Sequence, residues 1–220
     1  MHSRPRQLAF TIRAWGGCRR GAGRKPVGPK AGVPHLRRPH HDPRRPLHVT
    51  LRAVAGLPSF RASYVFPAVR AGLAAASRDT FRVAHFSVQS NHVHVLVEAE
   101  STESLSRGMR GLAIRVAKAV NRVLSRRGRV WADRFHARAL STPREVRRAL
   151  IYVLMNFRKH TGTERGIDPC SSARWFVGWR NGSSPRDTPP VAPVRTWFLN
   201  VGWRRAGEIT LDDRPSRPPK

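Results

Sequence analysis

Apolar residues recur along the chain with two different periods, and these separate predicted strands from predicted helices. Alternation with a period of two and many branched residues predict strands over residues 48–52, 81–88, 92–98 and 135–140. Apolar positions three and four residues apart predict helices over residues 59–78, 101–126 and 142–160. The predicted order of elements is therefore β-α-β-β-α-β-α.

The second and third predicted helices begin at clear start signals. Ser101 or Thr102 can cap the second helix, and Pro143 with Glu145 fits the first turn of the third. The first six elements match the ferredoxin-like split β-α-β arrangement, and the last helix is an addition. We therefore predict an α+β fold with an antiparallel sheet.

The chain divides by composition into three parts. Residues 1–46 hold twelve Lys or Arg and a single acid with many Gly and Pro, which predicts a disordered basic tail. Residues 47–162 contain all the predicted elements and form the expected domain. Residues 163–220 are rich in Gly, Ser and Pro, and their Trp residues predict short packed pieces rather than an independent domain.

The chain is strongly basic. Its 42 Lys and Arg against 13 Asp and Glu give a formal charge of +29, which favours a polyanionic partner such as nucleic acid. Only five of these cations are Lys, and an Arg bias also follows from a GC-rich genome. The charge nevertheless acts on phosphates.

Cysteine usage and hydropathy exclude two other classes. Two cysteines make neither a disulfide framework nor a C-x-x-C metal knuckle, and a reducing cytoplasm is the simplest environment. No apolar run approaches the length of a membrane span, and the basic N-terminus lacks the apolar core of a secretory signal. We expect a cytoplasmic protein without a membrane partner.

Two histidines interrupt the third predicted strand. His92 and His94 are two residues apart and so project from the same face, whereas the intervening and following valines point towards a core. Two imidazoles on a rigid element can bind a metal ion. The pair alone is weak evidence, because ten histidines in the chain make chance pairs common.

The last predicted helix has two stripes. Val146, Leu150, Val153 and Phe157 form one that should pack, and Arg148, Tyr152, Asn156 and Lys159 form another. Tyr152 as a core aromatic and Asn156 as a polar helix end are the structural alternatives. Combined with the histidine pair, however, the Asn156 amide can complete a three-ligand site for Mg²⁺ or Mn²⁺. Tyr152 would then attack a phosphate of single-stranded DNA and form a phosphotyrosine.

Other polar residues are candidates for DNA contact or for the site. Arg134, His136 and Arg138 share one face of the fourth strand, where they line a DNA groove or form a solvated basic face. The further candidates for DNA contact are Arg110, Arg115, Arg148 and Lys159. Glu98 shares the histidine face and could orient a ligand, whereas Tyr64 among apolar neighbours is expected in the core.

Three passages of the chain resemble the single-tyrosine HUH transposases, the insertion-sequence-200-like group that includes REP-associated tyrosine transposases. They are residues 87–97 with the histidine pair, residues 131–138, and residues 150–156, where a polar residue follows the tyrosine by four positions. The resemblance covers about residues 47–160. It implies an HUH endonuclease fold, metal-dependent cleavage of single-stranded DNA at hairpin-flanked or repeat ends, a 5′-phosphotyrosine, a free 3′-OH and later rejoining.

The resemblance also leaves points open. Family members act as monomers or as homodimers that donate the tyrosine helix in trans. Phe157 follows Asn156 where members often have proline, and the basic tail and C-terminal extension lie outside the small transposase core.

Two other functions remain as alternatives. One is a non-catalytic nucleic-acid-binding protein on the same fold, although RNA-binding modules of this kind place aromatics where this strand has histidines. The other is a replication initiator or relaxase, whose chains are usually larger.

Overall fold

Strands and helices alternate in the order that the apolar pattern predicts. The computed structural model describes residues 39–158, 166–180 and 187–215. Its main elements are β1 (Leu47–Arg52), α1 (Phe66–Ala74), β2 (Phe81–Val88), β3 (His92–Ala99), α2 (Thr102–Val123), β4 (His136–Ala139) and α3 (Pro143–Met155). Short elements follow: η1 (Ala173–Trp175), α5 (Trp197–Asn200) and η2 (Gly202–Ala206). The predicted α+β class is confirmed.

The sheet is antiparallel, and the histidine strand lies inside it. Its order is β2-β3-β1-β4, so β3 has a hydrogen-bonded neighbour on both sides. His94 lies opposite Thr50 of β1 and Ser87 of β2. A central strand holds its side chains more firmly than an edge strand, which suits a strand that carries functional groups.

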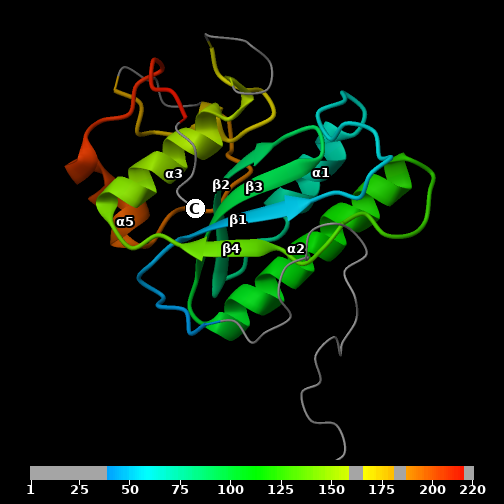
Figure 1. Cartoon of the computed structure of the whole chain (residues 1–220), viewed down its shortest axis with the longest axis horizontal. Helices are drawn as coiled ribbons and strands as arrows, with labels where there is room; N and C mark the ends of the chain where they lie inside the picture. The colour runs from blue at the N-terminus through cyan, green and yellow to red at the C-terminus, as the bar shows by residue number, and fades with distance from the viewer. Residues whose placement is uncertain (1–38, 159–165, 181–186, 216–220) are drawn as a thin grey trace, which may run out of the picture. The chain divides into compact units, whose positions relative to one another are not determined.

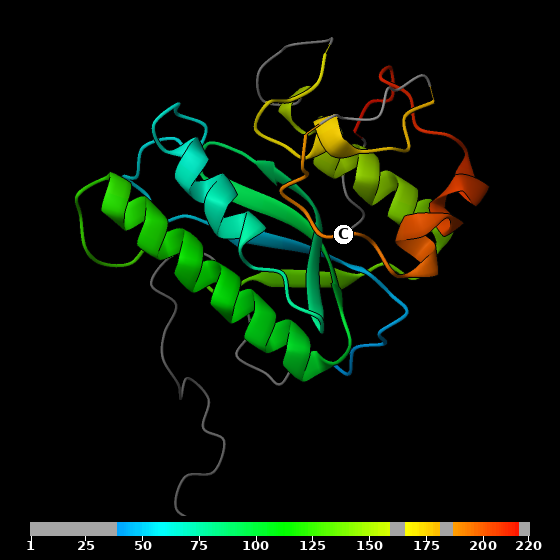
Figure 2. The same cartoon turned by 180° about the vertical axis from the view of Figure 1, so that it is seen from behind.

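Helices cover both faces of this sheet. Helices α1 and α2 pack side by side on one face and α3 lies on the other (Figure 1; Figure 2). Val93, Val95 and Val97 belong to the apolar core on the α1–α2 side, and Leu96 belongs to the core beneath α3. The alternation of β3 therefore directs the even-numbered residues, including both histidines, towards α3.

The predicted helix starts are confirmed by their caps. The Ser101 hydroxyl accepts a hydrogen bond from the backbone N–H of Ser104, and the Thr142 hydroxyl accepts one from Glu145. Each bond satisfies an N–H that the first turn cannot pair internally.

Two helix predictions were wrong in detail. Helix α1 spans only Phe66–Ala74 rather than residues 59–78, because Pro67 occupies its first turn. Tyr64 precedes this helix and is 57% exposed, so its predicted place in the core was wrong. In α2 (Thr102–Val123), Ile114 is 48% exposed, because it lies about 200° around the helix from the buried Leu112.

The C-terminal extension covers the outer edge of β2. The backbone N–H of Ser172 donates to the carbonyl of Phe86, and the N–H of Ala192 donates to the carbonyl of Val83. These bonds satisfy an edge that would otherwise be free to pair with another chain. Trp203 of the extension is buried in the core beneath α3, so this part of the extension packs onto the domain.

The folded unit begins before Pro46. His41 is 5% exposed, and its backbone N–H donates to the Thr102 hydroxyl. The rest of the predicted basic tail, residues 1–38, lies outside the described residues. Among the described helices, none combines the length and apolar character needed to cross a membrane.

Candidate active site

The two histidines of β3 lie together on the face that α3 covers. Their rings are 4.7 Å apart between centroids and nearly perpendicular. His94 is buried at 5% exposure, and His92 is half-buried. The sheet thus fixes both imidazoles on one rigid strand, as the spacing predicts.

Helix α3 of the same chain brings Tyr152 to this pair. The Tyr152 ring lies 5.1 Å from the His94 ring and 5.6 Å from the His48 ring, with edge-to-face geometry in both cases. Leu150 and Val153 on the same helix are fully buried and hold it against the sheet. One chain alone therefore places a phenol beside the histidines.

Asn156 follows Tyr152 by one helical turn and is fully buried. It is the C-cap of α3 and keeps helical backbone angles, so it lies on the Tyr152 side of the helix. Helix α3 begins near Ser141, which bonds Arg45 just before β1, at the end of the sheet far from His92. The helix therefore runs towards the His92 end of β3.

The Asn156 side chain makes no hydrogen bond with any described residue. Neither its amide oxygen nor its amide nitrogen has a partner, although both are shielded from solvent. An unsatisfied buried amide costs about 1–3 kcal/mol. A polar ligand would offset this cost.

Two residues of β1 contact His94 and were missed from the sequence. Nδ1 of His94 lies 3.1 Å from Oγ1 of Thr50 and 3.2 Å from Nε2 of His48. A proton on Nδ1 can donate to either atom, which directs the lone pair of Nε2 outwards, as metal-binding histidines require. His48 and Thr50 are two residues apart in β1, so the sequence predicts that they share one face of that strand. Only the strand order shows that this face lies beside His94 of β3.

Burial shifts the pKa values of the neighbouring groups. Desolvation, with smaller contributions from His136 and Arg138, lowers the pKa of His48 to about 4, so its ring is neutral at pH 7. Desolvation also raises the pKa of Tyr152 above its ordinary value. At pH 7 the His48 ring is therefore neutral, and the Tyr152 phenol keeps its proton.

Strand β4 extends the same polar face. His136 pairs with Thr50 and Arg138 with His48, so both side chains lie on the histidine side of the sheet. Arg138 forms an ion pair with Glu145, and His136 is exposed. Arg134 precedes β4 and Arg148 is exposed on α3. This arrangement suits a basic rim around the site.

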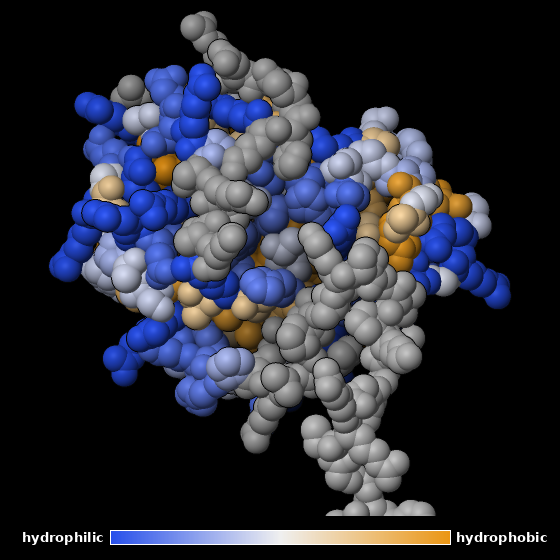
Figure 3. All heavy atoms as spheres, viewed as in Figure 1, coloured by the Kyte–Doolittle hydropathy of each residue, from blue (hydrophilic) through white to orange (hydrophobic). Residues whose placement is uncertain are grey.

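Two predicted DNA-contact residues lie elsewhere. Arg110 and Arg115 belong to α2, which packs on the opposite face of the sheet from the histidines. Their side chains therefore do not belong to the site around His92 and His94. Lys159 lies outside the described residues. Figure 3 shows hydrophilic side chains gathered over the α3 side of the molecule.

Glu98 is a structural residue and does not reach the histidine site. Its carboxylate is 1% exposed and accepts hydrogen bonds from Arg82 and from the backbone N–H groups of Arg195 and Thr196. These bonds anchor the C-terminal extension to β3. The alternation of β3 places Glu98 on the same face as His92 and His94. It does not show whether the carboxylate binds the extension or lies at the site.

The Asn156 amide is the candidate donor that is typical of a hard divalent ion. No group of three His, Cys, Asp or Glu in the described part of the chain could hold a metal. A set made of His92, His94 and Asn156 combines two imidazoles with an amide. Its buried amide lacks a partner, and amide oxygens are ligands for Mg²⁺ and Mn²⁺.

Two comparisons found proteins that are similar to this chain. Residues 71–153 match the family model described as "Transposase IS200 like", a range that includes both histidines and Tyr152. A solved REP-associated tyrosine transposase bound to a REP hairpin shares the fold, with a TM-score of 0.51 and 17% identity over 64% of this chain and 82% of that one. No curated protein matches the chain.

The matched range and the observed fold cover the same elements. The range begins in the last turn of α1 and ends three residues before Asn156. Residues 71–153, which carry β2, β3, α2, β4 and most of α3, are therefore similar to the IS200-like transposase family, and the fold is that of a REP-associated tyrosine transposase.

Proposed function

We propose that this protein nicks and rejoins single-stranded DNA with Tyr152 as the nucleophile. The observation that carries the proposal is the 5.1 Å separation between the Tyr152 and His94 rings within one chain. The half-buried phenol lies beside the imidazoles of His94 and His48, where a neighbouring base or a bound metal ion could activate it. Because all these groups come from one chain, we propose a site that is complete in the monomer.

In the proposed reaction, the Tyr152 oxygen forms a bond to phosphorus and the bond from phosphorus to the 3′ oxygen breaks. The phenol loses one proton and the leaving 3′ oxygen gains one, so the exchange is balanced. The products are a 5′-phosphotyrosine and a free 3′-OH. Attack by a 3′-OH on the phosphotyrosine reverses the step and rejoins a strand.

The side chains around Tyr152 have distinct roles in this proposal. His92, His94 and Asn156 would hold Mg²⁺ or Mn²⁺, which polarises the scissile phosphate when bound. Thr50 and His48 orient the His94 ring through Nδ1. Arg134, His136, Arg138 and Arg148 are proposed to bind the DNA backbone on the same face.

The substrate proposal rests on the fold relative and on the recessed site. The related transposase was solved bound to a REP hairpin. Tyr152 is only half-buried in a site between α3 and the sheet, which an unpaired backbone enters more easily than a duplex. We therefore propose single-stranded DNA flanked by a hairpin or repeat.

The proposal is tested by trapping the covalent adduct. The full chain is incubated with Mn²⁺ and labelled hairpin-bearing single strands, and the adduct is resolved by denaturing electrophoresis and mapped by mass spectrometry. We expect the label on Tyr152. Tyr152→Phe should abolish the adduct, whereas His92→Ala and His94→Ala should reduce it more than 100-fold.

The chain provides a matched control, because it contains only one other tyrosine. Tyr64 is 57% exposed and precedes α1 on the other side of the sheet, so Tyr64→Phe should form the adduct at the wild-type level. An adduct that persists in Tyr152→Phe would exclude the proposed nucleophile. Salt-dependent binding without any adduct would favour the non-catalytic DNA-binding protein.

A further inference from the structure

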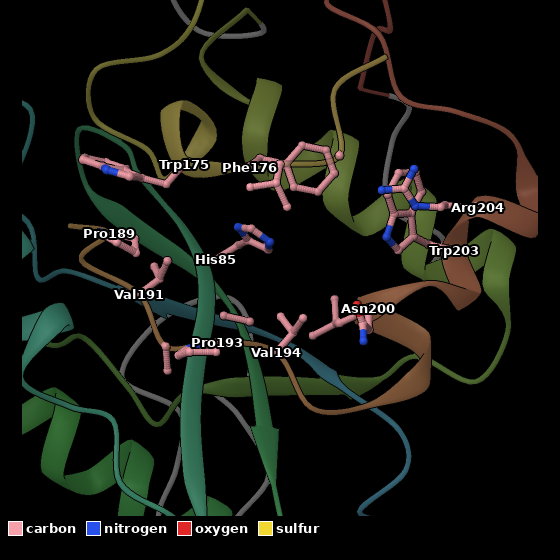
Figure 4. A pocket seen from close by; sticks show the side chains of 15 residues that line it. His85, Trp175, Phe176, Pro189, Val191, Pro193, Val194, Asn200, Trp203 and Arg204 are labelled. Atoms are coloured by element: carbon pink, nitrogen blue, oxygen red, sulfur yellow. The ribbon is translucent and has the colours of Figure 1, made fainter. Parts of the chain in front are cut away.

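A cavity of about 350 Å³ lies on the histidine side of the sheet, between β2 and the C-terminal extension. Figure 4 shows His85 from β2 facing Trp175 and Phe176, with Val191 and Val194 along the opposite wall. The cavity shares no residue with the set around Tyr152. Neither the match to the transposase family nor the proposed cleavage site accounts for it.

A β-bulge in β2 creates this cavity. The register between β2 and β3 shifts between Val83 and His85, so Ala84 and His85 together oppose Leu96. Ala84 and His85 therefore both line the cavity, whereas Val83 and Phe86 point into the α1–α2 core. Bulges redirect side chains in this way, often beside functional sites.

The extension leaves this stretch of the β2 edge open. Its backbone pairs with β2 at Phe86 and again at Val83, and the cavity lies between these two points. His85 lies opposite Leu96, two residues along β3 from His94, or about 7 Å along the strand. The cavity is therefore close to the proposed cleavage site and lies on the same side of the sheet.

The lining combines aromatic rings with a few polar groups. Trp175, Phe176 and Trp203 supply the rings. His85 uses Nδ1 to contact Ser172, and burial lowers its pKa to about 4, so the ring is neutral. A neutral ring can approach an uncharged ligand without burying a charge.

The indole N–H of Trp175 points to a ligand with a hydrogen-bond acceptor. It is shielded from solvent and has no acceptor among the described residues. A purely apolar occupant would leave it unsatisfied, whereas a carbonyl or ring nitrogen would not. Buried indoles usually find such a partner.

The rim of the cavity is cationic. Arg204 lines it, with its guanidinium carbon 4.8 Å from the centre of the Trp203 ring. Arg174, which does not line the cavity and forms an ion pair with Asp187, lies with its guanidinium 5.8 Å from the Trp175 ring. Aromatic rings beside arginines are the combination that binds bases and phosphates of single strands.

We propose that this cavity binds one unstacked nucleobase of the single-stranded DNA. The base would stack against the aromatic lining and accept from Trp175, while Arg204 contacts its phosphate. The volume is at the small end of ligand sites and suits a base with part of its sugar. The inference rests on the proposed function only in taking single-stranded DNA as the ligand.

The test is an abasic scan of DNA binding. The full chain is titrated with hairpin DNA whose single-stranded flank carries one abasic site, moved by one position at a time, and affinity is read by fluorescence anisotropy without metal. We expect a single position at which loss of the base weakens binding by about tenfold. A scan without any sensitive position overturns the proposal.

A blocking variant connects that position to the cavity. Val177 lines the cavity and is 74% exposed, so Val177→Trp should fill the entrance without disturbing the core. We expect it to bind intact DNA about tenfold more weakly and to be insensitive to the abasic site. Val201→Trp is the matched control, because Val201 is exposed outside the cavity and should behave as the wild type.

Two outcomes separate this inference from the proposed chemistry. If Val177→Trp keeps the full abasic penalty, the base binds elsewhere and the cavity proposal fails, whatever Tyr152 does. If the wild type forms no adduct on the same DNA but the penalty disappears in Val177→Trp, the base site stands and the chemistry fails.

Discussion

The two ends of the α3-facing side of β3 differ sharply in how their polar groups are used. At one end, Glu98 is buried and its carboxylate is bonded by Arg82 and two backbone N–H groups. At the other end, the His94 ring meets the rings of His92 and Tyr152, and the buried Asn156 amide at the end of α3 has no partner among the described residues. The same strand thus serves structure at one end and offers binding groups at the other.

This contrast shows that saturation of hydrogen bonds distinguishes the two roles better than residue type. A carboxylate is a stronger metal ligand than an amide, yet both oxygens of Glu98 already accept hydrogen bonds from the protein. The Asn156 amide has no hydrogen-bond partner among the described residues. Polar groups that a fold leaves unsatisfied in its interior require an explanation, and a ligand is one.

The largest effect should come from Asn156→Leu. We expect adduct formation to fall more than 100-fold, because the proposed metal ligand is lost, while the melting temperature stays the same or rises. Removing an unsatisfied buried amide relieves a penalty of about 1–3 kcal/mol. A melting temperature several degrees lower would instead show that the amide has a structural partner.

Glu98→Gln should lower stability and leave adduct formation unchanged, which is the reverse of the result expected for Asn156→Leu. It leaves the guanidinium of Arg82 buried without its counter-charge, which costs about 3–5 kcal/mol of unfolding free energy. The folded fraction should still form the adduct normally. Denaturant unfolding measures the loss, and Glu103→Gln in the exposed pair with Arg107 is the control, with no measurable change expected.

His85 lies between the two ends, opposite Leu96, and gives stability a dependence on pH. Its pKa is about 4 in the folded chain and about 6.5 in the unfolded chain, so the unfolded state binds the extra proton first. Stability is therefore full above pH 6.5 and falls as the pH drops towards 4, by roughly 3 kcal/mol from this residue. For His85→Phe, the unfolding free energy measured with denaturant should fall less between pH 6.5 and 4 than in the wild type. An equal fall in both proteins would contradict the prediction.

Thr50→Val tests how the histidine end is held in place. The change removes one partner of His94 Nδ1 and preserves the shape of the side chain. We expect Mn²⁺ affinity, measured by titration of adduct formation, to weaken by about 10–100-fold. Saturating Mn²⁺ should restore the wild-type rate, which loss of a direct ligand would not allow.

Much of the fold was present in the local pattern of the chain. The caps at Ser101 and Thr142 and the alternation of β2 and β3 fix these elements from neighbouring residues alone. Helix α1 was overextended, because Tyr64 and its neighbours fit a helical period but Pro67 sets the start. The sequence therefore predicted an element correctly where one local interaction, such as a helix cap, fixes where it begins.

By itself, the sequence determined that His92 and His94 share a face and that Tyr152 and Asn156 share another, because strand and helix periods are properties of the backbone. Only the tertiary structure decided that these two faces meet, that Thr50 and His48 hold His94, and that Glu98 anchors the extension. These contacts depend on strand order and on the side of the sheet that α3 covers. Both are set by long-range packing, which no local period encodes.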